Sequence, residues 1–139
     1  ILGSGSLENE LKKPDIGKNV RFLGFKDNIK EYLQASDIFI LPSFGEGLSN
    51  ALLEAMSCGL VAIANKIPAN EEVITNNING IIIDILDKRE LTLILYELIK
   101  NKELLDKLGN HARETVKNYF SITRIANLYV TLYKKILSN

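Results

Sequence analysis

Short apolar segments alternate with segments of helical pattern along this chain, and this alternation limits the possible fold more than any other feature. The apolar segments predict strands at 37–41, 60–64 and 80–84, with two shorter ones at 1–2 and 20–23. Helical patterns are found at 7–13, 28–34, 49–58, 88–100, 102–118 and 122–137. Strands separated by helices indicate a parallel sheet with helices on both faces. The sequence therefore predicts the α/β class, with a Rossmann-like sheet and a helical C-terminal segment.

Residues at the ends of these segments support the assignment. Asp27 is the predicted N-cap of the second helix, and Asp87 and Glu90 have the spacing of a capping box before the fourth. Gly59 follows the third helix, at a position where glycine commonly ends a helix. The segment 14–17 contains a proline and a glycine, so the first helix is predicted to end just before this segment.

Two predictions concern burial. The segment 37–41 is nearly all apolar, so we expect this strand to be buried on both faces of the sheet. The last helix has apolar residues spaced for one face, which we expect to pack in the core: Ile122, Ile125, Tyr129, Leu132 and Ile136. A membrane-surface helix is the weaker alternative, because Lys134 and Lys135 are its only basic pair.

Composition argues against several classes of function. The 17 basic residues balance 17 acidic ones, so no long-range field would attract nucleic acid or an anionic membrane. Cys58 is the only cysteine, so no disulfide forms within the chain, and we expect it to be a small core residue. With His111 as the only histidine, a zinc site is not expected. No signal peptide is visible, and no apolar run reaches the ~18 residues of a transmembrane segment.

The first residues resemble the end of a strand, because Ile1 and Leu2 are followed at once by Gly3. We therefore expect the sequence to be part of a longer protein. We interpret residues 1–139 as a single domain truncated at its N-terminus, with a C-terminal helix over 121–139.

Four loops are predicted to form the ligand-binding region. Ligands of parallel α/β sheets bind outside the carboxyl ends of the strands. The loops that follow the predicted strands there are 3–6, 24–27, 43–49 and 65–72.

The loop 43–49 has the strongest chemical signal, because it follows a buried strand and opens a helix. The free N–H groups at a helix N-terminus can hold a phosphate. Gly45 and Gly47 would let the backbone approach a ligand without a Cβ in the way. Ser49 and Asn50 could cap the helix or donate to the phosphate.

Two carboxylates flank this turn. Glu46 lies in the loop, and Glu54 lies about one and a half turns into the helix. A carboxylate accepts hydrogen bonds from paired hydroxyls, which both sugars and ribose offer. A phosphate site between two such carboxylates suits a nucleoside diphosphate sugar. The alternative, that both are solvated surface residues, stays open at this point.

Glu46 and Glu54 bracket seven residues, and this spacing resembles the E-x7-E motif of retaining GT-B glycosyltransferases, notably family 4. The resemblance continues on both sides of the motif in the same order. It covers about Val20 to Ser121 and rests on the segments 20–24, 35–43, 54–59, 67–72 and 79–80.

The resemblance implies roles for the residues of the motif. Glu46 is the implied catalytic residue, which contacts the transferred sugar and places its anomeric carbon. Glu54 would hold the ribose hydroxyls. The diphosphate would bind the backbone of Gly47, Leu48, Ser49 and Asn50.

The other implied donor-binding residues lie outside the motif. The base pocket would be lined by Gly24, Phe25 and Lys26, and a glycine turn facing the cleft would contain Gly3 and Gly5. Glu72 matches a loop position near the donor, although a solvated role is an equal alternative.

The sequence departs from the family pattern at three points. Pro68 and Ala69 stand where the family often has glycines, which would restrict that loop. In the family, an Arg and a Lys hold the diphosphate, and both lie upstream of the position that Ile1 matches. The acceptor-binding N-terminal lobe precedes it as well. Lys26 and Lys66 are more simply explained as surface residues than as replacements for those cations.

The expected function is donor binding in a retaining transfer of sugar to a saccharide or lipid-linked acceptor, in cell-surface polysaccharide or glycolipid synthesis. The resemblance implies a UDP- or GDP-linked donor, a front-face mechanism, and no cofactor or metal. It also implies a cytoplasmic protein, peripheral at the membrane in its full-length form. The isolated chain is expected to be inactive. A standalone nucleotide-sugar-binding module is the main alternative, and a GT-B epimerase or phosphorylase is a third.

Overall fold

The computed structural model describes residues 1–12 and 19–138, which fall into two units, Ile1–Tyr32 and Leu33–Asn139. The predicted end of the first helix at Lys13 and the turn 14–17 lie outside the described residues.

The described residues of the first unit contain short helical segments, and a paired segment takes the place of the two predicted short strands. Helix α1 spans Glu8–Leu11. The backbone of Ile1 pairs with Arg21 and Leu23, and the N–H of Gly3 donates to the carbonyl of Gly24 at 2.8 Å. The strands predicted at 1–2 and 20–23 are wrong, because only isolated bridges form there. Gly3 (φ 91°) and Gly24 (φ 66°) are left-handed, which interrupts the extended backbone where the segments meet.

Helix α2, Ile29–Gln34, begins one residue later than predicted, so Asn28 rather than Asp27 precedes it. Its residue Leu33 belongs to the second unit. There it is buried in a small cluster with Ala55 and Leu60. Cys58 is half-buried and packs against this cluster, at its margin.

The second unit contains a parallel sheet, as the sequence predicts. Its strands are β1 (Ile38–Leu41), β2 (Val61–Asn65) and β3 (Ile81–Ile83), in the order β1-β2-β3. Both pairs are parallel, with Ile38 opposite Val61 and Ile63 opposite Ile81. The predicted strands at 37–41, 60–64 and 80–84 are therefore confirmed to within one residue at each end.

The helices of the second unit also follow the predicted pattern. They are α3 (Asn50–Ser57), α4 (Pro68–Glu71), α5 (Lys88–Lys100), α6 (Lys102–Thr115), the π-helix η1 (Val116–Phe120) and α7 (Ile122–Leu137). The short helix α4 is an addition to the prediction, and the helix predicted at 102–118 is divided into α6 and the π-helix η1. Asp87 caps α5 by accepting from the N–H groups of Arg89 and Glu90, as its spacing indicates.

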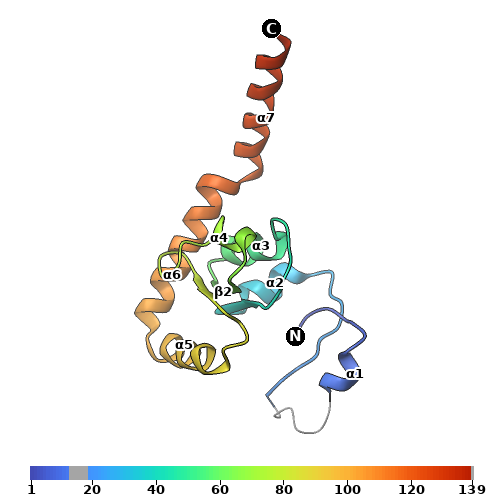
Figure 1. Ribbon diagram of the computed structural model, residues 1–139, viewed down its shortest axis with the longest axis vertical. Coiled ribbons are helices and arrows are strands. Elements are labelled where there is room, and N and C mark those ends of the chain that lie inside the picture. The colour runs from blue at the N-terminus through green and yellow to red at the C-terminus, as the bar shows by residue number, and fades with distance from the viewer. Residues whose placement is uncertain (13–18, 139) are drawn as a thin grey trace. The chain divides into compact units, whose positions relative to one another are not determined.

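Helices cover both faces of the sheet, which confirms the Rossmann-like arrangement (Figure 1). Every residue of β2 is buried. Val61 and Ile63 pack in a cluster with α5 and α6, whereas Ala62 and Ala64 pack in a cluster with α3, α6 and η1. Because successive side chains of a strand point to opposite faces, these two clusters are the two halves of the core.

Strand β1 is less buried than predicted. It lies at the end of the described strand order, and Ile40 is 39% exposed. The prediction of burial on both faces is therefore wrong for β1, and the strand that is buried throughout is β2, between β1 and β3. An apolar sequence does not distinguish an edge strand from a central one.

Helix α7 has the predicted bounds but not the predicted packing. None of its residues is buried, and Ile122 is 88% exposed. In Figure 1 the helix runs from η1 away from the sheet, so its apolar residues do not reach the core. The prediction that they pack in the core is therefore wrong. No helix in the described part of the chain is long and apolar enough to span a membrane.

Candidate functional site

The N-terminus of α3 has the form that the sequence predicts for a phosphate site. Ser49 is the N-cap, with extended backbone, and its Oγ accepts from the N–H of Leu52 at 3.4 Å. Ser49 is buried and Leu52 fully so, which fixes this end of the helix in the core. The geometry of a helix start leaves the N–H groups of Asn50 and Ala51 without acceptors inside the helix. An anion outside the helix can therefore bind them.

The loop before α3 is open to solvent. A Cβ added at Gly45 or Gly47 would meet no atom within 4 Å. Phe44 and Leu48 are 63% and 52% exposed. Exposed apolar side chains beside an open backbone are typical of a ligand-binding surface. Among the described residues, no atom lies close to the Cβ positions of the two glycines, so a ligand can approach their backbone.

Glu46 and Glu54 are both exposed. Glu54 lies on the outer face of α3, together with Asn50 one turn before it and Ser57 three residues after it, and all three line one hollow. The sequence did not assign a face to Glu54, because apolar residues stand on both sides of it. The structure places the carboxylate on the solvent side, where it can accept hydrogen bonds from a ligand.

The far wall of this hollow contains two cations that could not be predicted from the sequence. They are Arg113 in the last turn of α6 and Lys117 in η1. Their distance from Glu54 along the chain explains why no local pattern identified them.

Asn65, also missed, anchors the loop of Glu46 to the sheet. Its Nδ2 donates to the carbonyl of Ser43 at 3.2 Å, and its Oδ1 accepts from the N–H of Ile85 at 3.2 Å. Asn65 is 5% exposed and ends β2. A buried amide between two backbone groups holds both segments in place. The sequence feature that could have indicated this role is a polar residue at the end of an apolar strand.

The loop 65–72 contains the short helix α4, which begins at Pro68. Pro68 occupies the first turn, where a missing N–H costs nothing, so the proline that replaces a family glycine is accommodated by helix formation. Asn70 is fully buried and donates to the carbonyl of Asn65 at 2.9 Å. Its Oδ1 is the one buried side-chain polar atom without a partner in the described residues. Glu72 is exposed at the end of α4.

The remaining predicted residues belong to the first unit. Gly3, Gly5 and Phe25 are exposed, Phe25 by 76%, and Lys26 is half-buried. Gly3 and Gly24 have positive φ, a conformation that favours glycine. That these residues join the loops of the second unit in one site stays a prediction.

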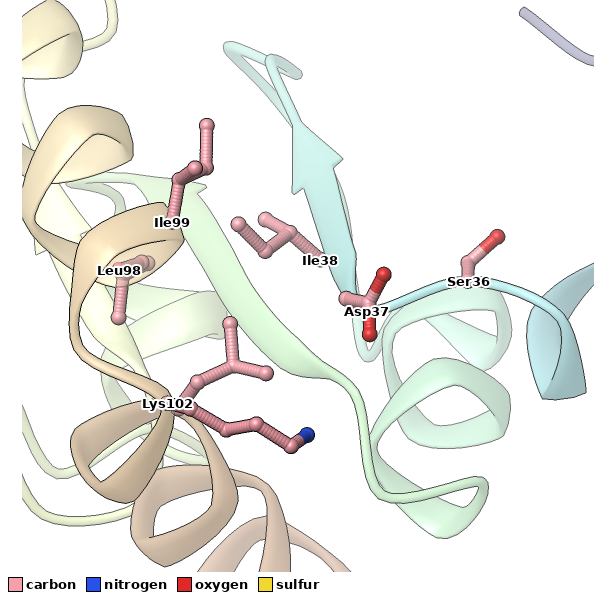
Figure 2. A pocket seen from close by; sticks show the side chains of 7 residues that line it. Ser36, Asp37, Ile38, Leu98, Ile99 and Lys102 are labelled. Atoms are coloured by element: carbon pink, nitrogen blue, oxygen red, sulfur yellow. The ribbon is translucent and has the colours of Figure 1, made fainter.

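Another hollow, of about 490 Å³, lies at the opposite end of β1. Figure 2 shows Leu98 and Lys102 facing Asp37 and Ile38, at the start of the strand. The loop 43–49 follows the carboxyl end of the same strand, so this hollow is separate from the predicted site. No group of three or more metal-ligating side chains is found in residues 1–12 and 19–138.

Comparisons with known proteins agree with this arrangement. The family model described as "Glycosyl transferases group 1" matches residues 1–115. The N-acetyl-alpha-D-glucosaminyl L-malate synthase of Bacillus anthracis is 34% identical over 127 residues, which are 91% of this chain and 33% of that protein. The UDP-Gal:alpha-D-GlcNAc-diphosphoundecaprenol alpha-1,3-galactosyltransferase of Escherichia coli is 32% identical, over 95% of this chain and 36% of that protein.

Among solved structures, sucrose-phosphate synthase from Thermosynechococcus elongatus superposes with a TM-score of 0.87 at 22% identity. The match covers 99% of this chain and 38% of that one. This likeness shows the fold. The chain spans about a third of the length of the relatives that it matches.

Proposed function

This chain belongs to the group 1 glycosyl transferases, and we propose that it is the nucleotide-sugar-binding half of a retaining glycosyltransferase with the GT-B fold. The observation that carries the proposal is the start of α3. An open glycine loop leads into a helix with free N–H groups, and Glu54 faces solvent one turn further on.

These groups suit the parts of a nucleoside diphosphate sugar. The diphosphate binds the backbone of Gly47, Leu48, Ser49 and Asn50, at the start of α3, where the helix dipole favours negative charge. The carboxylate of Glu54 accepts hydrogen bonds from the two ribose hydroxyls. Glu46, in the loop before the helix, contacts the transferred sugar and orients its anomeric carbon. The diphosphate leaves with more negative charge than it had in the donor, so the same N–H groups stabilise the transition state.

The other predicted residues complete the donor site in this proposal. Gly24, Phe25 and Lys26 line the base pocket, Gly3 and Gly5 form the glycine turn, and Glu72 lies near the donor. The reaction needs no metal and proceeds with retention at the anomeric carbon.

The names of the relatives suggest the donor and the acceptor. The Escherichia coli relative uses UDP-Gal and an acceptor with a diphosphoundecaprenol group. We infer a UDP-linked sugar as the first donor to test and a GDP-linked one as the second. The acceptor is a saccharide or lipid-linked saccharide, held by a second lobe. A lipid-linked acceptor would place the full-length protein at the cytoplasmic face of a membrane.

The test is a transfer assay on the complete protein with UDP- and GDP-sugars, with and without EDTA. We expect one donor to be used, with EDTA leaving the rate unchanged and NMR of the product showing the anomeric configuration of the donor. Glu46→Gln should lower kcat about 100-fold, the cost of a misplaced reacting centre. Glu103→Gln, an exposed carboxylate on α6, is the matched control.

Three outcomes would contradict parts of this proposal. An inverted product excludes retention, and a Glu46→Gln variant of unchanged kcat removes the role of Glu46. Donor binding without any transfer favours the binding-module alternative.

A further inference from the structure

The hollow beside Glu54 has a volume of about 560 Å³, within the range of small-ligand sites. One wall is the outer face of α3, with Asn50, Glu54 and Ser57. The other wall is the end of α6, the π-helix η1 and the first residues of α7. All of these elements belong to the second unit.

The charged residues that line this hollow are one carboxylate, Glu54, and two cations, Arg113 and Lys117. The cations are four residues apart in a continuous helical segment, so they project from the same face. Lys117 is 3.5 Å from Glu114, but both side chains are more than half exposed. Such a pair is weak and leaves the ammonium free to bind another anion. Arg113 has no ion-pair partner among the described residues.

Apolar residues of both walls also line the hollow. Leu53 and Phe120 line the hollow and are half-buried against the core cluster of α3 and η1. The lining of the hollow thus contains two cations and one carboxylate, and Glu114, which pairs with Lys117, is not part of that lining.

We propose that Arg113 and Lys117 bind the phosphates of the nucleotide whose ribose Glu54 holds, and so select nucleoside diphosphates over nucleosides. Asn50 lines the same hollow, so the N-terminus of α3 and the two cations face a common space. The planar guanidinium of Arg113 suits bidentate contact with phosphate, and Lys117 adds a point charge. This inference rests on the proposed function, since it assumes that Glu54 holds a ribose.

The experiment compares a diphosphate with its nucleoside on the complete protein by titration calorimetry. UDP and uridine are the first probes, and GDP and guanosine replace them if GDP binds more tightly. The variant is Arg113→Gln/Lys117→Gln, whose side chains are exposed, so the fold should be kept. The matched control is Lys88→Gln/Lys107→Gln, two exposed cations that do not line the hollow.

We expect the variant to bind UDP about tenfold more weakly, because it loses charge-assisted hydrogen bonds to the phosphates near the protein surface. Uridine binding should not change, and the dependence of UDP affinity on salt should become shallower. The control should match the wild type in all three respects.

Two results would overturn this inference and leave the proposed function standing. In one, the variant binds UDP as the wild type does while Glu54→Ala binds it weakly. In the other, the variant loses UDP and uridine equally, which indicates a structural role. If the wild type binds neither UDP nor GDP, the proposed function fails together with the inference.

Discussion

Replacing Gly109 by alanine should destabilise the protein, although alanine is the better helix former. Gly109 is buried in α6 where this helix crosses the end of α3. A Cβ there would lie 2.2 Å from the carbonyl oxygen of Gly59. An ordinary contact requires the helix to retreat by about 1 Å or more, and a backbone carbonyl cannot rotate away. Overpacking of this kind costs roughly 3 kcal/mol.

The gain in helix propensity is about 1 kcal/mol, so the expected net loss for Gly109→Ala is about 2 kcal/mol. For a chain of this length that loss lowers the Tm by about 6 °C. Thermal and urea unfolding of the protein measure it.

Two controls separate the clash from other effects. Asn110→Ala, at the exposed neighbouring position, should be neutral or slightly stabilising. In Gly59→Ala the new Cβ would lie 3.8 Å from the nearest atom, but φ is 85°, so only backbone strain of about 1–2 kcal/mol is expected. A Gly109→Ala protein as stable as the wild type would refute the close contact between the two helices.

Three further predictions concern buried or capping polar groups. Asn79 is 3% exposed and forms hydrogen bonds with Val73, Thr75 and Thr115. Asn79→Ala should therefore lower the free energy of unfolding in urea by about 2–4 kcal/mol. A loss below about 1 kcal/mol would show that water replaces these hydrogen bonds. Asn65→Leu should weaken nucleotide binding by freeing the loop of Glu46 from the sheet, and unchanged affinity in calorimetry would contradict that anchoring role. Asp87→Ala should lose about 1 kcal/mol in thermal unfolding, the usual value of an N-cap, and an unchanged Tm would argue against the cap.

Features fixed by neighbouring residues in the chain could be predicted from the sequence. Ser49 and Gly59 bound α3, and Asp87 caps α5, because these residues act on backbone within a few positions of themselves. The parallel sheet could be predicted for the same reason, since its apolar segments are separated by helical ones. The loop 43–49 and the start of α3 also depend on local chemistry.

Features that depend on distant neighbours could not be predicted. The apolar residues of β1 and α7 have patterns typical of core elements, yet Ile40 and Ile122 are exposed, because only the tertiary arrangement decides what lies against them. Arg113 and Lys117 reach the hollow of Glu54 through the path of α6 and η1. Asn65 contacts Ser43 across 22 positions of sequence. None of these relations leaves a periodic pattern in the chain.

The most direct test of the proposed donor site is a titration of the complete protein with UDP, GDP and ADP, for the wild type and for Glu54→Ala. We expect one diphosphate to bind, at millimolar affinity or better, which corresponds to at least ~4 kcal/mol. Glu54→Ala should weaken that binding about tenfold, because the ribose hydroxyls lose a charged acceptor. Equal affinity of both proteins for the nucleotide would contradict the role of Glu54, and the absence of binding by the complete wild-type protein would contradict the donor site itself.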